Sequence, residues 1–121
     1  MHKIYHLASC STNQRILSEA GIPAKPIEQQ EIKTQPITAQ QLDAMKQLAG
    51  SYEALFSRKA LKFRAMGLHE KQLTETDYRH LLLSEYTFLK RPVAIINNQI
   101  FIGNAKATVE ALKAAVEKLP G

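Results

Sequence analysis

Residues 93–102 read Val-Ala-Ile-Ile-Asn-Asn-Gln-Ile-Phe-Ile. The apolar residues 93–96 and the residues 99–102 carry the β-branched and aromatic content typical of strands. Asn97 and Asn98 lie between them and indicate a two-residue turn, because asparagine tolerates the positive φ that such turns require. The stretch therefore predicts an antiparallel β-hairpin. Gly103-Asn104 then leads into a final helix with apolar residues on one face.

The N-terminal part of the chain predicts a strand–helix–strand unit. Lys3 to Leu7 has strand character, and a helix pattern follows from Ser11 to about Ala20. Residues 24–32 indicate a weaker strand, and Pro26 within them favours an edge position. A strand–helix–strand unit of this kind forms a parallel pair joined by a crossover.

Residues 36–90, between these two halves, predict a helical insert. Thr38 with Gln41 has the spacing of a helix-initiating capping box, and Gly50 is placed to end that helix. Thr74 caps a further helix that we expect to reach about Leu89. The basic stretch between the two helices is expected to form a short helix or an irregular loop.

This order of elements predicts an α/β fold with a mixed four-stranded sheet flanked by helices. Thioredoxin-like folds have this architecture, here with a helical insertion of about residues 36–90 between a βαβ half and a ββα half. No linker or repeat interrupts the 121 residues, so we expect residues 1–121 to form a single domain.

The composition excludes several classes of protein. With 45% hydrophobic and 22% charged residues the chain is neither disordered nor fibrous, and no apolar run approaches the length of a membrane span. Its single cysteine excludes an internal disulfide and suits a reducing compartment, so we expect a cytoplasmic protein. Leu7-Ala8-Ser9-Cys10 imitates a lipoprotein attachment box, but the six residues before it are too few for a signal peptide.

Positive charge gathers in one part of the chain, whose net charge is +5. No acidic residue lies between Glu53 and Glu70, whereas the stretch includes Arg58, Lys59, Lys62 and Arg64. Such a cluster suits an acidic protein partner or a small oxyanion, or it is an ordinary solvated face. No nucleic-acid motif accompanies it, so we expect no direct nucleic-acid binding.

Cys10 is the candidate nucleophile. It lies where the first strand ends and the first helix begins, and both the free N–H groups and the helix dipole favour a thiolate there. His6 lies four residues earlier on the strand, and Ser11, Thr12 and Asn13 add hydroxyl and amide groups able to bind an anion. The alternative is an inert buried cysteine, which is a common structural residue.

Two other kinds of chemistry at Cys10 are less well supported. His2, His6 and Cys10 are evenly spaced, but no fourth ligand completes a zinc site, so we expect no metal. A dithiol oxidoreductase needs Cys-x-x-Cys, and here the second position is Asn13. Only monothiol chemistry is available, with the second thiol supplied by another molecule.

Arg91-Pro92 is the second candidate element of the site. A proline directly before a buried strand can adopt the cis form in a tight turn. In thioredoxin-like folds such a proline lies against the active cysteine, which brings Arg91 toward Cys10, and Arg58 is a second candidate cation. Guanidinium groups match the paired oxygens of a tetrahedral anion. Either arginine alone is equally well explained as a surface ion pair.

The ordered motifs resemble those of one superfamily. The opening Ile4-Tyr5-His6 with Cys10-Ser11-Thr12-Asn13, the segment Ser57-Arg58-Lys59 and the segment Leu89-Lys90-Arg91-Pro92-Val93 resemble ArsC-type arsenate reductases. Ile102-Gly103-Asn104 is more similar to the matching turn of Spx-type transcriptional regulators, the sister branch. The chain is therefore identified as a member of the ArsC/Spx superfamily.

The resemblance implies a function and a set of roles. Cys10 would attack arsenate, His6 would help to keep it ionised, and Arg58 with Arg91 would hold the oxyanion. Glutathione would be the co-substrate and glutaredoxin a partner, with no bound cofactor. ArsC enzymes carry a third anion-binding arginine where this chain has Gly103. Lys106 is close in sequence but offers a point charge and not a planar fork.

The alternative is a non-catalytic, Spx-like regulatory protein. Proteins of that branch bind the α-subunit of RNA polymerase and sense oxidation through Cys-x-x-Cys. Asn13 removes that redox switch, while the basic stretch 58–64 remains able to bind an acidic protein surface.

Overall fold

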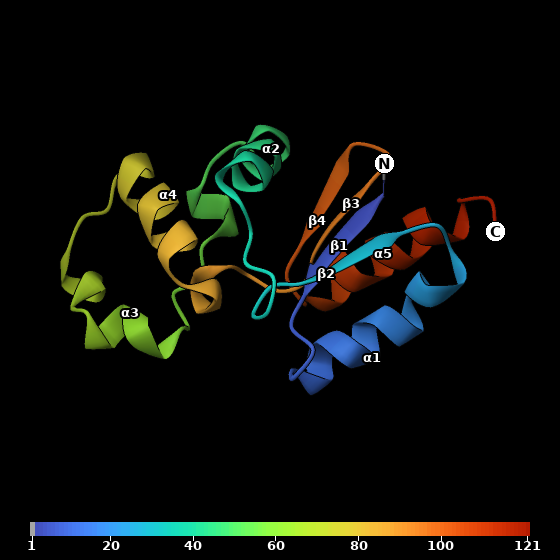
Figure 1. Ribbon diagram of the computed structural model, residues 1–121, viewed down its shortest axis with the longest axis horizontal. Coiled ribbons are helices and arrows are strands. Elements are labelled where there is room, and N and C mark those ends of the chain that lie inside the picture. The colour runs from blue at the N-terminus through green and yellow to red at the C-terminus, as the bar shows by residue number, and fades with distance from the viewer. Residues whose placement is uncertain (1) are drawn as a thin grey trace. The chain divides into compact units, whose positions relative to one another are not determined.

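The computed structural model describes residues 2–121, and Figure 1 shows its helices and strands. The chain divides into two compact units. The first unit contains the residues up to Pro36 together with Arg91–Gly121, and the second contains Ile37–Lys90. The second unit thus comprises the helical insert expected between the two halves of the fold.

The first unit is built on a four-stranded mixed sheet with the order β2-β1-β3-β4. Its strands are β1 (Lys3–His6), β2 (Glu28–Glu31), β3 (Val93–Ile96) and β4 (Gln99–Ile102). Strand β1 pairs in parallel with β2 and antiparallel with β3, and β3 pairs antiparallel with β4. The predicted α/β, thioredoxin-like fold class is confirmed.

The β3–β4 hairpin forms as the sequence indicates. Asn97 and Asn98 have φ values of 50° and 62°, the left-handed conformation that a two-residue hairpin turn requires. Val93 pairs with Ile102 and Ile96 with Gln99, so all four residues of each strand are in register. Strand β4 therefore runs in the same direction as β1.

Two helices of the first unit, α1 (Ser11–Glu19) and α5 (Lys106–Glu117), pack on one face of the sheet. In Figure 1 the two helices run beside each other, α1 at the bottom and α5 to the right of the strands. The alternation of a strand puts Ile4 on this face, where it is fully buried. The core formed there consists of Ile4, Ile16, Leu17, Ala20, Ile22, Ile27, Ala94, Ile96, Leu112, Val116 and Leu119.

Strand β2 is shorter than the expected strand over residues 24–32. Ile22–Ala24 forms a 3-10 helix, and only Glu28–Glu31 pairs with β1. Pro23 lies in the first turn of that 3-10 helix, which its fixed φ favours. The predicted edge position of β2 is confirmed, because β1 is its neighbour in the sheet order and no strand lies beyond it in residues 2–121.

The second unit contains α2 (Ala39–Ala49), α3 (Leu61–Ala65) and α4 (Glu75–Ser84), with short 3-10 turns between them. Thr38 and Thr74 each form a complete capping box at the start of α2 and α4. Gly50 ends α2 with φ 93°. Helix α4 ends earlier than expected, because Glu85 is extended (φ −154°) and the chain continues as a 3-10 turn.

Aromatic packing holds the second unit together. Phe56 is fully buried and stacks on Phe88 with a ring-centroid distance of 5.0 Å. Tyr78 and Phe63 pack against the same ring at 5.0 and 5.9 Å. Aromatic pairs in such geometries stabilise a fold by more than the burial of their apolar surface alone. They give the insert a core of its own.

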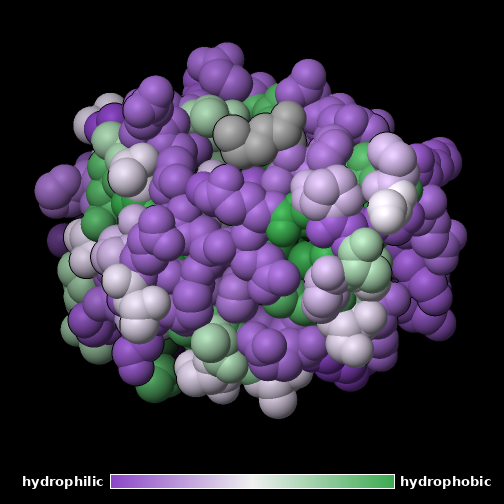
Figure 2. Space-filling model, turned by 45° about the vertical axis from the view of Figure 1, so that its right-hand side comes forward, coloured by the Kyte–Doolittle hydropathy of each residue, from purple (hydrophilic) through white to green (hydrophobic). Residues whose placement is uncertain are grey.

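The surface carries no extended apolar feature in the face drawn in Figure 2, where hydrophobic residues form small groups between hydrophilic ones. None of the helices in residues 2–121 has the length and apolar character that spanning a lipid bilayer requires.

Candidate active site

Cys10 occupies the N-cap position of α1, as the sequence indicates. Its backbone N–H donates to the carbonyl of Leu7 at 3.1 Å and closes a tight turn between β1 and α1. Its own carbonyl accepts the first helical hydrogen bond, from Gln14, at 3.1 Å. Cys10 as a residue is half-buried.

The sulfur of Cys10 is contacted by a side chain and not by the helix backbone. Asn13 Nδ2 donates to Cys10 Sγ at 3.4 Å, and the Cys10 side chain makes no cap hydrogen bond to a backbone N–H. Asn13 Oδ1 accepts the Leu7 N–H at 3.0 Å, and Asn13 is only 1% exposed. The Leu7 N–H therefore holds the amide in place, and the amide presents an N–H donor to the sulfur.

Ser11 and Thr12 occupy the first turn of α1, beside the N-cap cysteine. Ser11 is exposed and Thr12 is half-buried. Neither hydroxyl has a hydrogen-bond partner in the part of the chain that the structure describes. Both hydroxyl groups are thus available to bind an anion. That they do so stays a prediction.

His6 is the last residue of β1 and is 8% exposed. Burial lowers its pKa below the usual 6.5, with the neighbouring Glu31 charge opposing that shift. Its Nδ1 has no hydrogen-bond partner, and no hydrogen bond joins it to Cys10 among residues 2–121. Near neutral pH the ring is uncharged, so any assistance to Cys10 would come from an N–H donor and not from a positive charge.

Arg91 and Pro92 directly precede β3, and the bond between them is cis. Because Tyr5 of β1 pairs with Val93, the start of β3 lies beside the end of β1. Arg91-Pro92 and the turn that leads to Cys10 therefore lie at the same edge of the sheet. The predicted role of Arg91 in binding an oxyanion beside Cys10 stays a prediction.

Arg58 belongs to the second unit. Its guanidinium donates to Glu53 Oε2 and to the Tyr78 hydroxyl, both at 2.7 Å. Lys62, also from the basic cluster, pairs with Glu85. Both cations are therefore partly neutralised within the insert, which favours the interpretation of the cluster as a solvated face. The predicted role of Arg58 toward an oxyanion is not tested by these contacts.

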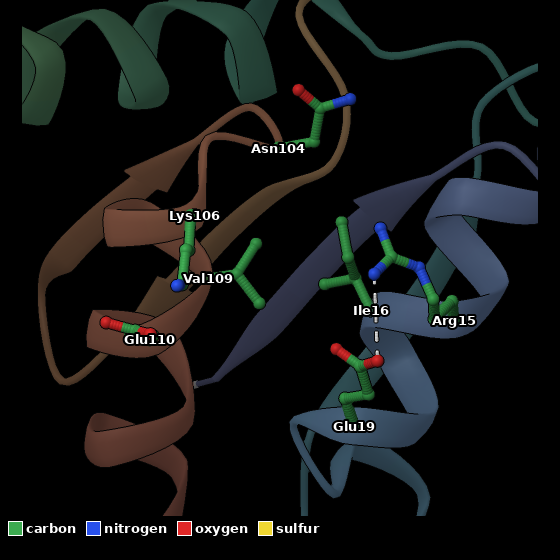
Figure 3. Close-up of a pocket in the computed structure, with 7 residues that line it drawn as sticks. All are labelled: Arg15, Ile16, Glu19, Asn104, Lys106, Val109 and Glu110. Atoms are coloured by element: carbon green, nitrogen blue, oxygen red, sulfur yellow. Dashed lines mark ion pairs between the residues drawn. The ribbon is translucent and has the colours of Figure 1, made fainter.

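Gly103 stands where the resemblance leads one to expect a third arginine. It has φ 86°, and a Cβ added to it would meet no atom within 4 Å. Lys106 lies in the first turn of α5 and lines a pocket of about 400 Å³ between α1 and α5 (Figure 3). The full lining consists of Arg15, Ile16, Glu19, Asn104, Lys106, Val109 and Glu110. Cys10 and Arg91 do not contribute to it.

One residue of this region is absent from the set of predicted site residues. Glu31, at the end of β2, accepts the backbone N–H of Ala8 at 3.0 Å. The available signal was a glutamate at the end of an expected edge strand, followed by Lys33 and Thr34 in a turn. That pattern does not show that the carboxylate reaches the turn before Cys10.

Residues 2–121 contain no group of three His, Cys, Asp or Glu side chains placed to hold a metal ion. His2, which the metal interpretation needed, instead accepts the Asn97 N–H at 3.2 Å through Nδ1. The evenly spaced His2, His6 and Cys10 are thus not gathered into one site.

A family model of the ArsC family matches residues 5–112. The chain belongs to the ArsC family. Three solved structures have folds similar to that of this ArsC-family chain. An arsenate reductase from Vibrio cholerae is 18% identical with a TM-score of 0.77, and 92% of this chain and 96% of that chain are covered.

Two further structures give the same result. An arsenate reductase (ArsC) related protein from Brucella melitensis is 22% identical with a TM-score of 0.69, covering 91% of this chain and 92% of that one. A possible arsenate reductase from Streptococcus mutans is 26% identical with a TM-score of 0.73, covering 93% and 97%. No curated protein matches the chain. The resemblance to ArsC-type proteins that the motifs indicated is confirmed.

Proposed function

We propose that this ArsC-family protein is a monothiol oxidoreductase of the arsenate reductase type. The Cys10 thiolate attacks arsenate, or a related oxyanion or mixed disulfide. The observation that carries the proposal is the donation of Asn13 Nδ2 to Cys10 Sγ at 3.4 Å, on a partly exposed N-cap cysteine. A buried, inert cysteine would need neither a dedicated donor nor access to solvent.

The chemistry needs two thiols besides Cys10. The Cys10 sulfur displaces one oxygen of arsenate, which leaves as water, and arsenic remains in the +5 state. A first glutathione thiol displaces a second oxygen, again as water, and leaves arsenic(V) bonded to the sulfurs of Cys10 and glutathione. A second thiol, from glutaredoxin or glutathione, attacks the glutathione sulfur and forms a disulfide; the S–As bond breaks, and its electron pair reduces arsenic to the +3 state. Water then hydrolyses the bond between Cys10 and arsenic, which releases arsenite and the Cys10 thiol. Once glutathione has reduced any glutaredoxin disulfide, one arsenate and two glutathiones have yielded arsenite, glutathione disulfide and water. The two electrons that reduce arsenic from +5 to +3 come from the two glutathione thiols.

Glutathione is the proposed co-substrate and glutaredoxin the proposed partner for the last exchange, with no resident cofactor. Asn13 occupies the position at which a dithiol enzyme would carry its resolving cysteine. Because the chain has a single cysteine, its redox cycle cannot close internally. An external thiol is therefore a requirement of the mechanism.

The proposed ligands of the oxyanion are the first-turn groups of α1 and two arginines. Arg91 is supported by its position at the sheet edge where β1 ends, whereas Arg58 is proposed on the motif resemblance alone. Guanidinium groups bind two oxygens at once and neutralise the charge that the approaching thiolate would otherwise repel. Because Gly103 stands where ArsC enzymes carry a third anion-binding arginine, the proposed site has one cation fewer. We therefore expect it to bind arsenate weakly.

The deciding experiment measures arsenate reduction with glutathione and glutaredoxin. The wild-type protein should turn over arsenate, and Cys10→Ser should abolish turnover. The double variant Cys10→Ser/Ser18→Cys moves the single thiol to an exposed position near the end of the same helix. It should be inactive as well, because a thiol there has no amide donor. No turnover by the wild type with arsenate or glutathione mixed disulfides would refute the proposal.

A second candidate function is a non-catalytic, Spx-like role in binding RNA polymerase or another protein. One observation favours it: Leu61 is 91% exposed and Met66 is 49% exposed, on and directly after α3. Exposed apolar residues beside Lys59 and Lys62 suit a partner with an acidic rim. Direct binding to the purified C-terminal domain of the polymerase α-subunit, lost in Leu61→Asp and in Lys62→Glu, would support this function.

A further inference from the structure

The carboxylate of Glu31 is the acceptor for four hydrogen bonds. Three are local: Oε1 accepts the N–H groups of Lys33 and Thr34 at 3.1 and 2.8 Å, and the Thr34 hydroxyl at 2.9 Å. The fourth is long-range, because Oε2 accepts the N–H of Ala8, 23 residues earlier, at 3.0 Å. One oxygen thus shapes the turn after β2 while the other reaches the turn before Cys10.

The register of the sheet makes this contact available. Glu31 lies opposite His6 in the parallel β1–β2 ladder, and both strands end there. The chain leaves β1 through Leu7 and Ala8, so the Ala8 N–H has no further strand partner. The Ala8 and Thr34 N–H groups hold the pKa of the Glu31 carboxyl at about 2, well below its usual value of 4.5. The acceptor is therefore ionised throughout the physiological range.

Two consecutive amides of the turn are held by side chains from different elements. Asn13 of α1 accepts the Leu7 N–H at 3.0 Å, and Glu31 of β2 accepts the Ala8 N–H at 3.0 Å. The third bond of the turn, from Cys10 N–H to Leu7 carbonyl, sets the position of the cysteine itself. Loss of the hydrogen bond from the Ala8 N–H to Glu31 would leave the Ala8 end of the turn unrestrained. The contact between Asn13 Nδ2 and the Cys10 sulfur would then be held less precisely.

We propose that Glu31 is a positioning residue for Cys10: its carboxylate fixes the Leu7–Cys10 turn through the Ala8 N–H and thereby keeps the sulfur against Asn13. The inference deepens the proposed function, on which it rests. A nearby negative charge cannot by itself favour a second anion. If Glu31 raises the reactivity of Cys10, it therefore does so by positioning the turn. The negative charge of Glu31 by itself would lower that reactivity.

This difference in sign defines the experiment. Cys10 is the single cysteine, so its alkylation by iodoacetamide, a neutral reagent, reports one thiol. Glu31→Gln removes the charge and places an amide NH₂ against donor N–H groups. Glu31→Asp keeps the charge and the local turn but is one carbon too short to reach Ala8. Glu28→Gln is the matched control, because Glu28 lies on the same strand and pairs with Lys3.

In both Glu31→Gln and Glu31→Asp, alkylation at pH 7 should slow about threefold or more, as expected for one lost charge-assisted hydrogen bond. Exchange of the Ala8 amide should accelerate in the same variants, and Glu28→Gln should match the wild type in both measurements. The Asp variant, which preserves the local turn, keeps the test available if the Gln variant does not fold.

Two results would overturn the inference. Faster alkylation in Glu31→Gln with no change in Glu31→Asp would mean that only the charge acts on the thiol. Faster Ala8 exchange with unchanged alkylation would mean that the bond is only structural. Neither result depends on arsenate. A wild-type protein that fails to reduce arsenate would count against the proposed function and leave the alkylation result standing.

Discussion

Asn13 links Leu7 to Cys10: it accepts the Leu7 N–H through Oδ1 at 3.0 Å and donates to the Cys10 sulfur through Nδ2 at 3.4 Å. The sulfur thus has a hydrogen-bond donor in this buried amide, whereas it accepts no cap hydrogen bond from the free N–H groups at the start of α1. A carboxamide can do both at once because its acceptor oxygen and its donor nitrogen are separate atoms.

Asn13→Asp separates these two functions of the side chain. Aspartate keeps an oxygen for the Leu7 N–H but places a second, charged oxygen against the sulfur. We expect Cys10 alkylation at pH 7 to slow about tenfold, because a donor is replaced by a like charge. The pH dependence of the alkylation rate measures this directly. Asn98→Asp, in the β3–β4 turn, introduces the same charge at a distance and should leave the rate unchanged.

His6 should make stability depend on pH. Its pKa is lowered in the folded protein, so the unfolded chain binds the proton more readily. The contribution of the neutral ring is fully present above pH 6.5, the usual value, and is lost as the pH falls below it. Urea midpoints should therefore decrease between pH 7 and pH 5 in the wild type.

The variant His6→Gln should flatten that decrease, because it removes the group that takes up the proton. His80, an exposed histidine of α4, supplies the matched control His80→Gln, which should keep the wild-type slope. An equal slope in His6→Gln and the wild type would show that the burial of His6 is not the source of the dependence.

Gly103→Arg tests whether a missing cation limits the binding of arsenate. The position is open, but its φ of 86° opposes any side chain, so the variant should lose about 1–2 kcal/mol of stability. If the new guanidinium reaches the anion, KM for arsenate should fall about tenfold. Gly103→Ala carries the same strain without the charge, and should show the loss of stability with no change in KM.

Arg58→Ala tests the cation proposed from the insert. Its ion pair with Glu53 is half exposed, so the free energy of unfolding should change by about 1 kcal/mol or less. Arsenate turnover should nevertheless fall about tenfold or more if Arg58 binds the oxyanion. Arg64→Ala removes a neighbouring exposed cation and should retain turnover. Equal activities in the two variants would exclude a specific role for Arg58.

Much of the fold was predictable from short-range patterns. The Asn97-Asn98 turn and the capping box at Thr38 act over two to four residues, and each formed as expected. The two errors arose where neighbouring signals compete. The helix after Thr74 stops at Ser84 because Glu85 is extended, and strand β2 begins only at Glu28, after a 3-10 helix. The chain divides into two compact units. That residues 1–121 form a single domain stays a prediction.

The sequence by itself determined that one cysteine would start a helix after a strand, because strand and helix periodicity are local properties of the chain. Only the tertiary structure decided what meets that cysteine. The Ala8 N–H reaches Glu31 because the crossover lays β2 parallel to β1 with His6 opposite Glu31. Hydrogen bonds between segments depend on register and on which groups the strands leave unpaired, and no local pattern encodes either of them.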